Sequence, residues 1–267
     1  MTPRVMGIVN VTPDSFSDGG RLGSAEAAVA HGLRLVEQGA DLLDVGGEST
    51  RPGAEPVSET DEIARVVPVI TGLRAAWTGP ISVDTMKPAV ARVAVAAGAT
   101  MWNDVTALTF SPHAPAVAAE LGCDVALMHM RGHPRTMQAD PRYDDVVAEV
   151  RDWLLARAEA AMAAGVARDR VWLDPGIGFG KTAAHNLLLT ARLDALTATG
   201  FPVLYGASRK RTIQFVDPTA TDPGDRLGGS LALALEAARL GASILRVHDA
   251  RETAQALKML AAVRAAI

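Results

Sequence analysis

Eight short apolar segments recur along this chain, and a polar or charged residue follows each of them. The segments are 6–9, 42–43, 81–83, 101–102, 125–128, 171–173, 203–205 and 244–247, followed by Asn10, Asp44, Asp84, Asn103, His129, Asp174, Ser208-Arg209-Lys210 and His248. Short apolar runs between turn formers are typical of buried strands. A ring of polar residues at the ends of eight strands is the site geometry of a (β/α)8 barrel. We therefore predict an α/β fold, a single (β/α)8 TIM barrel with its active site at the C-terminal ends of the strands.

The length and composition suit one such barrel, so we expect residues 1–267 to form a single domain. Apolar residues make up 49% of the chain and charged residues 21%, which excludes a disordered protein. A net charge of −4 without a basic patch argues against nucleic acid or an anionic membrane as a partner. Because we find no signal peptide and no apolar stretch of membrane-spanning length, we expect a cytoplasmic protein.

Helical spacing returns between the predicted strands. The expected helices include 58–77, 143–164, 186–196, 227–240 and 253–267. The segment 212–226 is rich in Asp, Pro, Thr and Gly and predicts a loop instead. The one cysteine, Cys123, is expected to be a small buried hydrophobic residue, since no catalytic cysteine signature surrounds it.

The stretch 171–181 shows the strand-end pattern most clearly. A short strand ends on Asp174, and Gly176, Gly178 and Gly180 follow in a loop. Alone, this stretch would more often be a simple turn, but its recurrence at seven other strand ends favours a site. The loop also resembles a Walker phosphate loop, which requires Gly where Pro175 stands, so we discount nucleotide binding.

Three strand ends carry acceptors or an amide, namely Asp84, Asn103 and Asp174. Together they suit a flat heterocycle with several ring N–H groups, whose orientation fixed hydrogen-bond partners would set. The alternative is that each side chain caps its own loop.

Cationic residues also gather at strand ends and in the loops that follow, namely Arg51, Lys210 and Arg246 with His248. Arg246 and His248 alternate on one strand, so both face the same way. A buried arginine needs an anion, which is either a substrate phosphate or a strand-end Asp in a structural salt bridge. No His pair has zinc spacing, whereas Mg²⁺ shared with a substrate phosphate needs only one or two protein ligands.

Two phenylalanines, Phe16 and Phe179, stand in loops rich in glycine. A large apolar side chain gains little there unless something covers it. Packing within its own loop is the simpler alternative for each of them.

Two loop motifs and six strand-end motifs together resemble dihydropteroate synthases, in order and across essentially the whole chain. The motifs are 7–20, 44–53, Asp84, Asn103-Asp104, 128–130, 174–179, 208–210 and 246–248. That family joins p-aminobenzoate to 6-hydroxymethyl-7,8-dihydropterin pyrophosphate and releases pyrophosphate and 7,8-dihydropteroate. The resemblance implies a homodimer formed through the late helices, and inhibition by sulfonamides that compete with p-aminobenzoate.

The resemblance also implies roles for residues of this chain. The pterin would be held by Asp84, Asn103, Met128, Asp174 and Lys210. The pyrophosphate would be held by Asn10, Arg246 and His248, with Asn10 also a ligand of Mg²⁺. The p-aminobenzoate pocket would consist of Thr50, Arg51, Pro52, Phe179 and Ser208, with Phe16 and Asp18 added by the closing first loop. The catalytic group would be Asp84, Asp174, Lys210, Arg246, Phe16 and Asp18.

The chain departs from the family pattern after Asn103-Asp104, where Val105 to Phe110 replace a Ser-Gly-Gly turn, and again after Lys210. These departures leave two alternatives to the synthase. One is a non-catalytic pterin-binding paralogue, and the other is a methyltetrahydrofolate-dependent methyltransferase domain. The methyltransferase should lack a pyrophosphate-binding cluster, so Arg246 and the loop 50–52 argue against it.

Overall fold

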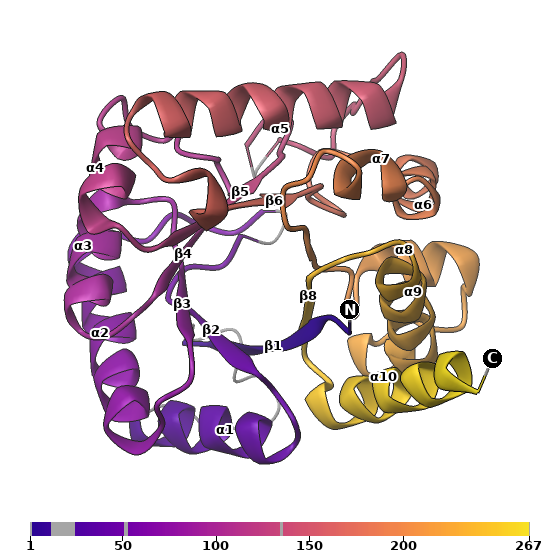
Figure 1. The fold of residues 1–267 in the computed structure, drawn as a ribbon, viewed down its shortest axis with the longest axis horizontal. Coiled ribbons are helices and arrows are strands. Elements are labelled where there is room, and N and C mark those ends of the chain that lie inside the picture. The colour runs from indigo at the N-terminus through magenta and orange to yellow at the C-terminus, as the bar shows by residue number, and fades with distance from the viewer. Residues whose placement is uncertain (1, 12–24, 51–52, 134–135, 267) are drawn as a thin grey trace.

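Eight parallel strands form the centre of the molecule (Figure 1). A computed structural model describes residues 2–11, 25–50, 53–133 and 136–266. The strands are β1 (Arg4–Asn10), β2 (Leu42–Gly46), β3 (Ile81–Asp84), β4 (Met101–Asp104), β5 (Asp124–Met128), β6 (Val171–Asp174), β7 (Leu204–Tyr205) and β8 (Ile244–Val247). They follow the order β6-β5-β4-β3-β2-β1-β8-β7, and a parallel bridge between Leu173 and Val203 joins the two edges. The predicted (β/α)8 barrel is confirmed.

The helices surround this barrel in Figure 1. They are α1 (Ala25–Glu37), α2 (Glu59–Ala76), α3 (Pro88–Ala96), α4 (Ala114–Leu121), α5 (Val146–Ala163), α6 (Ala183–Ala191), α7 (Asp194–Thr197), α8 (Arg211–Val216), α9 (Leu227–Arg239) and α10 (Ala250–Ala265). Their apolar faces and the outward side chains of the strands form one large core, which includes Leu43, Val83 and Leu154. The outward side of every strand is therefore covered by helix, as parallel sheets require.

The helices differ from the sequence-based expectation at two places. The expected helix 186–196 is two helices, α6 and α7, which together begin earlier. Its start at Ala183 follows from Thr182, whose hydroxyl accepts from the backbone N–H of His185 in a capping box. The prediction of a loop over 212–226 was wrong at its beginning, where α8 lies. Buried Ile213 packs against Gly229 of α9, so tertiary contact rather than local propensity stabilises this short helix.

Inside the barrel, side chains form layers because alternate residues of a strand face inward. A lower apolar layer consists of Met6, Leu42, Met101, Ala126, Trp172, Leu204 and Ile244. Two residues further along five of these strands come Asp44, Asn103, Met128, Asp174 and Arg246. The apolar layer therefore closes the barrel below, and the layer above it is largely polar and lies toward the C-terminal ends of the strands.

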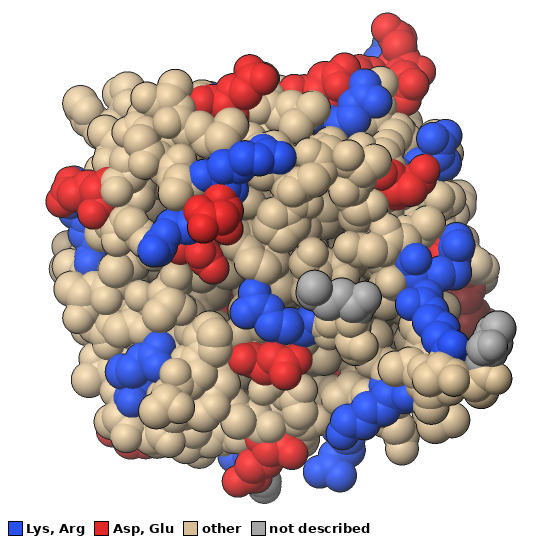
Figure 2. All heavy atoms as spheres, in the orientation of Figure 1, with Lys and Arg blue, Asp and Glu red and all other residues tan. Residues whose placement is uncertain are grey.

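The surface carries charges of both signs without a single-sign patch on the face shown in Figure 2. This distribution agrees with the modest net charge of −4. In the described residues, no helix is both long and apolar enough to cross a membrane.

Candidate active site at the barrel mouth

Arg246 lies at the centre of the polar layer and forms two ion pairs across the barrel. Its Nε lies 2.6 Å from Oδ2 of Asp44, and one terminal nitrogen lies 2.8 Å from Oδ2 of Asp84. Asn103 donates from Nδ2 to the same oxygen of Asp44 at 3.1 Å. Strands β2, β3, β4 and β8 thus contribute to one hydrogen-bonded network.

Asp44 belongs to this site although no role was predicted for it. Its side chain is fully buried, and its second oxygen has no hydrogen-bond partner among the residues that the structure describes. A signal for it was present in the sequence, because Asp44 follows the apolar pair 42–43 just as Asp84 follows the apolar run 81–83, although β2 continues to Gly46. The alternative of a structural salt bridge is present in the structure, where Arg246 pairs with the strand-end Asp84 and also with Asp44 inside β2.

The network changes the proton affinity of its members. Burial raises the pKa of Asp84 to about 7, while the guanidinium of Arg246 opposes this shift. Burial would by itself lower the pKa of Arg246, but Asp44 and Asp84 reverse this effect and raise it. Arg246 therefore stays charged, and Asp84 titrates near neutral pH.

Asp174 and Lys210 carry opposite charges at the mouth and attract each other without forming a direct ion pair. Asp174 ends β6 and is buried, and its Oδ1 accepts from the N–H of Gly176 at 2.7 Å. Burial raises the pKa of this carboxyl group against the attraction of Lys210 and Arg246. Burial likewise lowers the pKa of Lys210 to about 8, while Asp174 opposes this change. Each residue thus helps to keep the other charged in a poorly solvated place.

The loop after β6 also contacts Lys210. The side-chain nitrogen of Lys210 donates to the carbonyl oxygen of Ile177 and lies 4.7 Å from the ring centre of Phe179. Such a position above an aromatic face is favourable for a cation. Phe179 is half-buried and covers the lysine, so it has a contact beyond its own loop.

Ser208 and His248 meet at the ends of β7 and β8. The hydroxyl of Ser208 lies 3.0 Å from Nδ1 of His248 and accepts from the backbone N–H of His248 at 3.2 Å. Between Ser208 and Lys210, Arg209 has a left-handed backbone with φ +58°. Arg209 is held there by Asp249 at 2.5 Å and by its N–H bond to Ser230. A strained backbone conformation of this kind persists only where contacts with the surrounding structure hold it in place, and it often marks functional sites.

Of the remaining predicted residues, some lie in the part of the chain that the structure describes and some do not. Asn10 ends β1 and Thr50 follows β2, and both are half-buried. Met128 is buried at the end of β5, in register with Asp174. The other four predicted residues, Phe16, Asp18, Arg51 and Pro52, lie outside the described residues.

The oxygen chemistry near β1 suits a hard cation. Oδ1 of Asn10 and Oδ2 of Asp84 each lie 3.7 Å from the position that a Cβ would take on Gly46. Within the described ranges, no three His, Cys, Asp or Glu residues are arranged to hold a metal ion. A metal here would need oxygens from a substrate, as Mg²⁺ bound with phosphates usually has.

The unusual loop after Asn103 keeps a conformation that normally needs glycine. Ala107 and Leu108 have φ angles of +50° and +61°. The carboxylate of Asp104 holds this turn by accepting from the N–H groups of Thr106 and Leu108, at 2.7 and 2.8 Å. Arg157 donates to the carbonyl oxygen of Ala107 at 2.9 Å. The departure from the family pattern is therefore accommodated without displacing Asn103 from the mouth.

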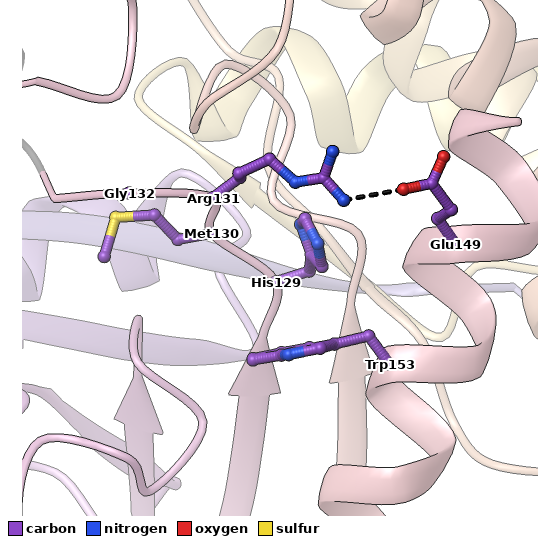
Figure 3. Close-up of a pocket in the computed structure, with 6 residues that line it drawn as sticks. All are labelled: His129, Met130, Arg131, Gly132, Glu149 and Trp153. Carbon is purple, nitrogen blue, oxygen red and sulfur yellow. Dashed lines mark hydrogen bonds and ion pairs between the residues drawn. The ribbon is translucent and has the colours of Figure 1, made fainter. Parts of the chain in front are cut away.

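A cavity of about 420 Å³ lies elsewhere, on the outer side of the loop after β5 (Figure 3). Its lining residues are His129, Met130, Arg131, Gly132, Glu149 and Trp153. None of the residues predicted to bind a substrate lines it, so we place the site at the barrel mouth.

Comparison with known proteins places the chain in one family. The family described as pterin binding enzyme matches residues 6–248. Dihydropteroate synthase of Escherichia coli is 47% identical over 265 residues, covering 99% of this chain and 93% of that protein. The structure of Xanthomonas albilineans dihydropteroate synthase with 4-aminobenzoic acid is 55% identical, covers 98% of this chain and 93% of that chain, and has a TM-score of 0.93. A Yersinia pestis dihydropteroate synthase with a sulfonamide drug is 45% identical, covers 99% and 95%, and has a TM-score of 0.94.

The protein is a (β/α)8 barrel with buried carboxylates at its mouth, and the family model matches most of its length. These findings together define it as a pterin-binding enzyme. The relatives named above are dihydropteroate synthases that match almost the whole chain at high identity, and the chain belongs to the dihydropteroate synthase family. The matches favour the synthase over the methyltransferase and the non-catalytic paralogue.

Proposed function

We propose that this chain condenses 6-hydroxymethyl-7,8-dihydropterin pyrophosphate with p-aminobenzoate to give 7,8-dihydropteroate and pyrophosphate. The observation that carries the proposal is the convergence of Asp84, Asp174, Lys210 and Arg246 at one barrel mouth in a member of the synthase family. Acids and bases in one poorly solvated site suit a reaction that separates charge.

The pterin would lie against the polar layer. Asp174 on β6 is a buried acceptor and Asp84 on β3 a half-buried one, and Asn103 lies on β4, next to β3. These groups match the ring N–H groups of a pterin, while Lys210 would donate to a ring acceptor. Met128, in register with Asp174, would supply an apolar contact to the ring.

The pyrophosphate would lie toward β1 and β8. Arg246 and His248 would bind its oxygens, and Asn10 would hold Mg²⁺ together with those oxygens. The paired positions of Asn10 Oδ1 and Asp84 Oδ2 support an oxygen-rich site of this kind. When bound, Mg²⁺ supplies positive charge that stabilises the leaving pyrophosphate.

The p-aminobenzoate pocket would form beside the pterin from Thr50, Phe179 and Ser208. The predicted contributions of Arg51, Pro52, Phe16 and Asp18 fall outside the described residues and stay predictions. Related structures contain 4-aminobenzoic acid, 7,8-dihydropteroate and a sulfonamide drug. We accordingly expect a sulfonamide to compete with p-aminobenzoate in this enzyme.

The charges at the mouth favour a dissociative, SN1-like substitution. As the C–O bond to pyrophosphate breaks, positive charge develops on the pterin methylene carbon and negative charge on the leaving group. Asp84 and Asp174 would stabilise the first charge and Arg246 with His248 the second, since their fixed positions require little reorganisation. The neutral aromatic amine then attacks the methylene carbon and afterwards loses a proton.

The test is a steady-state assay of pyrophosphate release. We expect release to depend on both substrates and on Mg²⁺, and Asp174→Asn to abolish pterin binding measured by calorimetry. The isosteric change removes one charge while keeping the side-chain volume. Normal turnover by this variant would refute the assignment of Asp174, and no turnover by the unaltered enzyme would refute the proposed function.

The oligomeric state and the location stay predictions. A homodimer through the late helices is supported by Met259 and Val263, which lie one turn apart on α10 and are 61% and 60% exposed. Val263→Glu should then shift the mass measured by light scattering from dimer to monomer. The cytoplasmic location and the single-domain organisation of residues 1–267 likewise stay predictions.

A further inference from the structure

Lys181 has a buried side chain directly after the loop that carries Phe179, and it is only 2% exposed. Its side-chain nitrogen is surrounded by acceptors. It lies 3.0 Å from the carbonyl oxygens of both Gly176 and Phe179, 3.2 Å from that of His129, and 2.9 Å from Nδ1 of His129. No carboxylate forms an ion pair with it in the described parts of the chain.

The two loop carbonyls belong to one tight turn. The N–H of Phe179 donates to the carbonyl oxygen of Gly176 at 3.1 Å, so both oxygens bound by Lys181 mark the ends of this turn. A Cβ on Gly176 would lie 1.9 Å from the carbonyl oxygen of His129, which shows how closely the turn packs on the end of β5. Lys181 therefore joins the two ends of the turn to the neighbouring strand.

His129 is itself held in place for this contact. Its ring packs edge-on against Trp153, with the ring centres 5.0 Å apart (Figure 3). Its backbone N–H donates to the carbonyl oxygen of Asp174 at 3.0 Å, which continues the ladder between β5 and β6. Lys181 thus contacts a rigid part of the barrel on one side and the turn on the other.

We infer that Lys181 is a positioning residue of the p-aminobenzoate pocket. It holds the turn 176–179 so that Phe179 stands over Lys210. The inference rests on the proposed function, in which Phe179 lines that pocket. Asp174 depends on the turn less than Phe179 does, because the β5–β6 ladder fixes its backbone and only its carboxylate contacts the turn, at the N–H of Gly176. Loss of Lys181 should therefore affect p-aminobenzoate more than the pterin substrate.

The decisive variant is Lys181→Met, which keeps an unbranched side chain but removes the donor. We expect KM for p-aminobenzoate and the inhibition constant of a sulfonamide to rise in parallel by about tenfold or more, since small misplacements of binding groups have effects of this order. KM for the pterin pyrophosphate should change by less than about threefold. Leu257→Ala, which removes a buried side chain of α10 across the barrel, is the matched control for lost stability.

A second variant keeps the test decisive if Lys181→Met does not fold. His129→Phe retains an aromatic ring against Trp153 but removes one acceptor, so the same selective rise in KM should appear with smaller size. Equal changes in both KM values, or a lowered Tm with both KM values unchanged, would show that Lys181 only stabilises the fold. Absence of turnover in the unaltered enzyme would instead refute the proposed function and is seen before any variant is made.

Discussion

Replacing Arg246 by Met should leave the carboxylates of Asp44 and Asp84 without their shared cation. Arg246 pairs with Asp44 at 2.6 Å and with Asp84 at 2.8 Å, and the side chain of Asp44 is fully buried. Removing one partner of a buried pair costs about 3–5 kcal/mol. Arg246 itself is 21% exposed, so we expect the lower end of this range at pH 8. With roughly 2–4 °C per kcal/mol for a chain of this size, Tm should fall by about 6–12 °C.

The loss should depend on pH in a defined direction. Burial has already raised the pKa of Asp84 to about 7, and removing the guanidinium that opposes this shift raises it further. The folded variant then holds a proton that the unfolded chain releases near its ordinary pKa. Its stability is therefore present at low pH and is lost as pH rises through the folded pKa. The difference from the unaltered protein should be roughly half as large at pH 5 as at pH 8.

Urea unfolding followed by circular dichroism at pH 5 and pH 8 measures both the loss of stability and its dependence on pH. Arg239→Met is the control, because Arg239 forms an exposed pair with Glu236 that water screens, so its loss should change the stability little. In the assay, Arg246→Met should lower kcat by about 10²–10³, as expected for one group that stabilises developing charge. A loss of stability that is equal at both pH values, or absent, would refute the ion-pair argument.

Two further predictions concern proton affinity and backbone geometry. The pH profile of kcat/KM should be bell-shaped with its maximum between pH 7 and 8. The reason is that Asp84 loses its charge below a pKa of about 7 and Lys210 loses its charge above a pKa of about 8. A value of kcat/KM that does not change between pH 6 and pH 9 would contradict this assignment. Gly176→Ala should destabilise the protein by more than about 2 kcal/mol, since φ is +65° and the new Cβ would meet the carbonyl oxygen of His129. Gly228→Ala in α9, where the Cβ would meet nothing, should be neutral or stabilising in the same unfolding experiment.

The residues that face the barrel interior could be predicted from the sequence because strand periodicity is local. Once Leu42 or Trp172 is assigned to an inward position, Asp44 and Asp174, two residues later, must face inward as well. The same reasoning places Arg246 two residues after Ile244. Fold, family and the general position of the site follow from that pattern and from the strand-end motifs.

The partners of these residues could not be predicted in the same way. Arg246 is paired with Asp44 across 202 positions of sequence, and only closure of the barrel brings them within hydrogen-bond distance. The buried contacts of Lys181 likewise depend on how the turn after β6 packs against the end of β5. In the sequence, Lys181 stands in a motif that resembles a Walker phosphate loop but has Pro175 in place of its first glycine.

The sequence by itself determined which side chains point into the barrel, since alternation along a strand is a property of the backbone. The tertiary structure alone decided their charge states and their partners. Burial and distance set the pKa values of Asp84 and Lys210, and both arise only when eight strands meet around one axis.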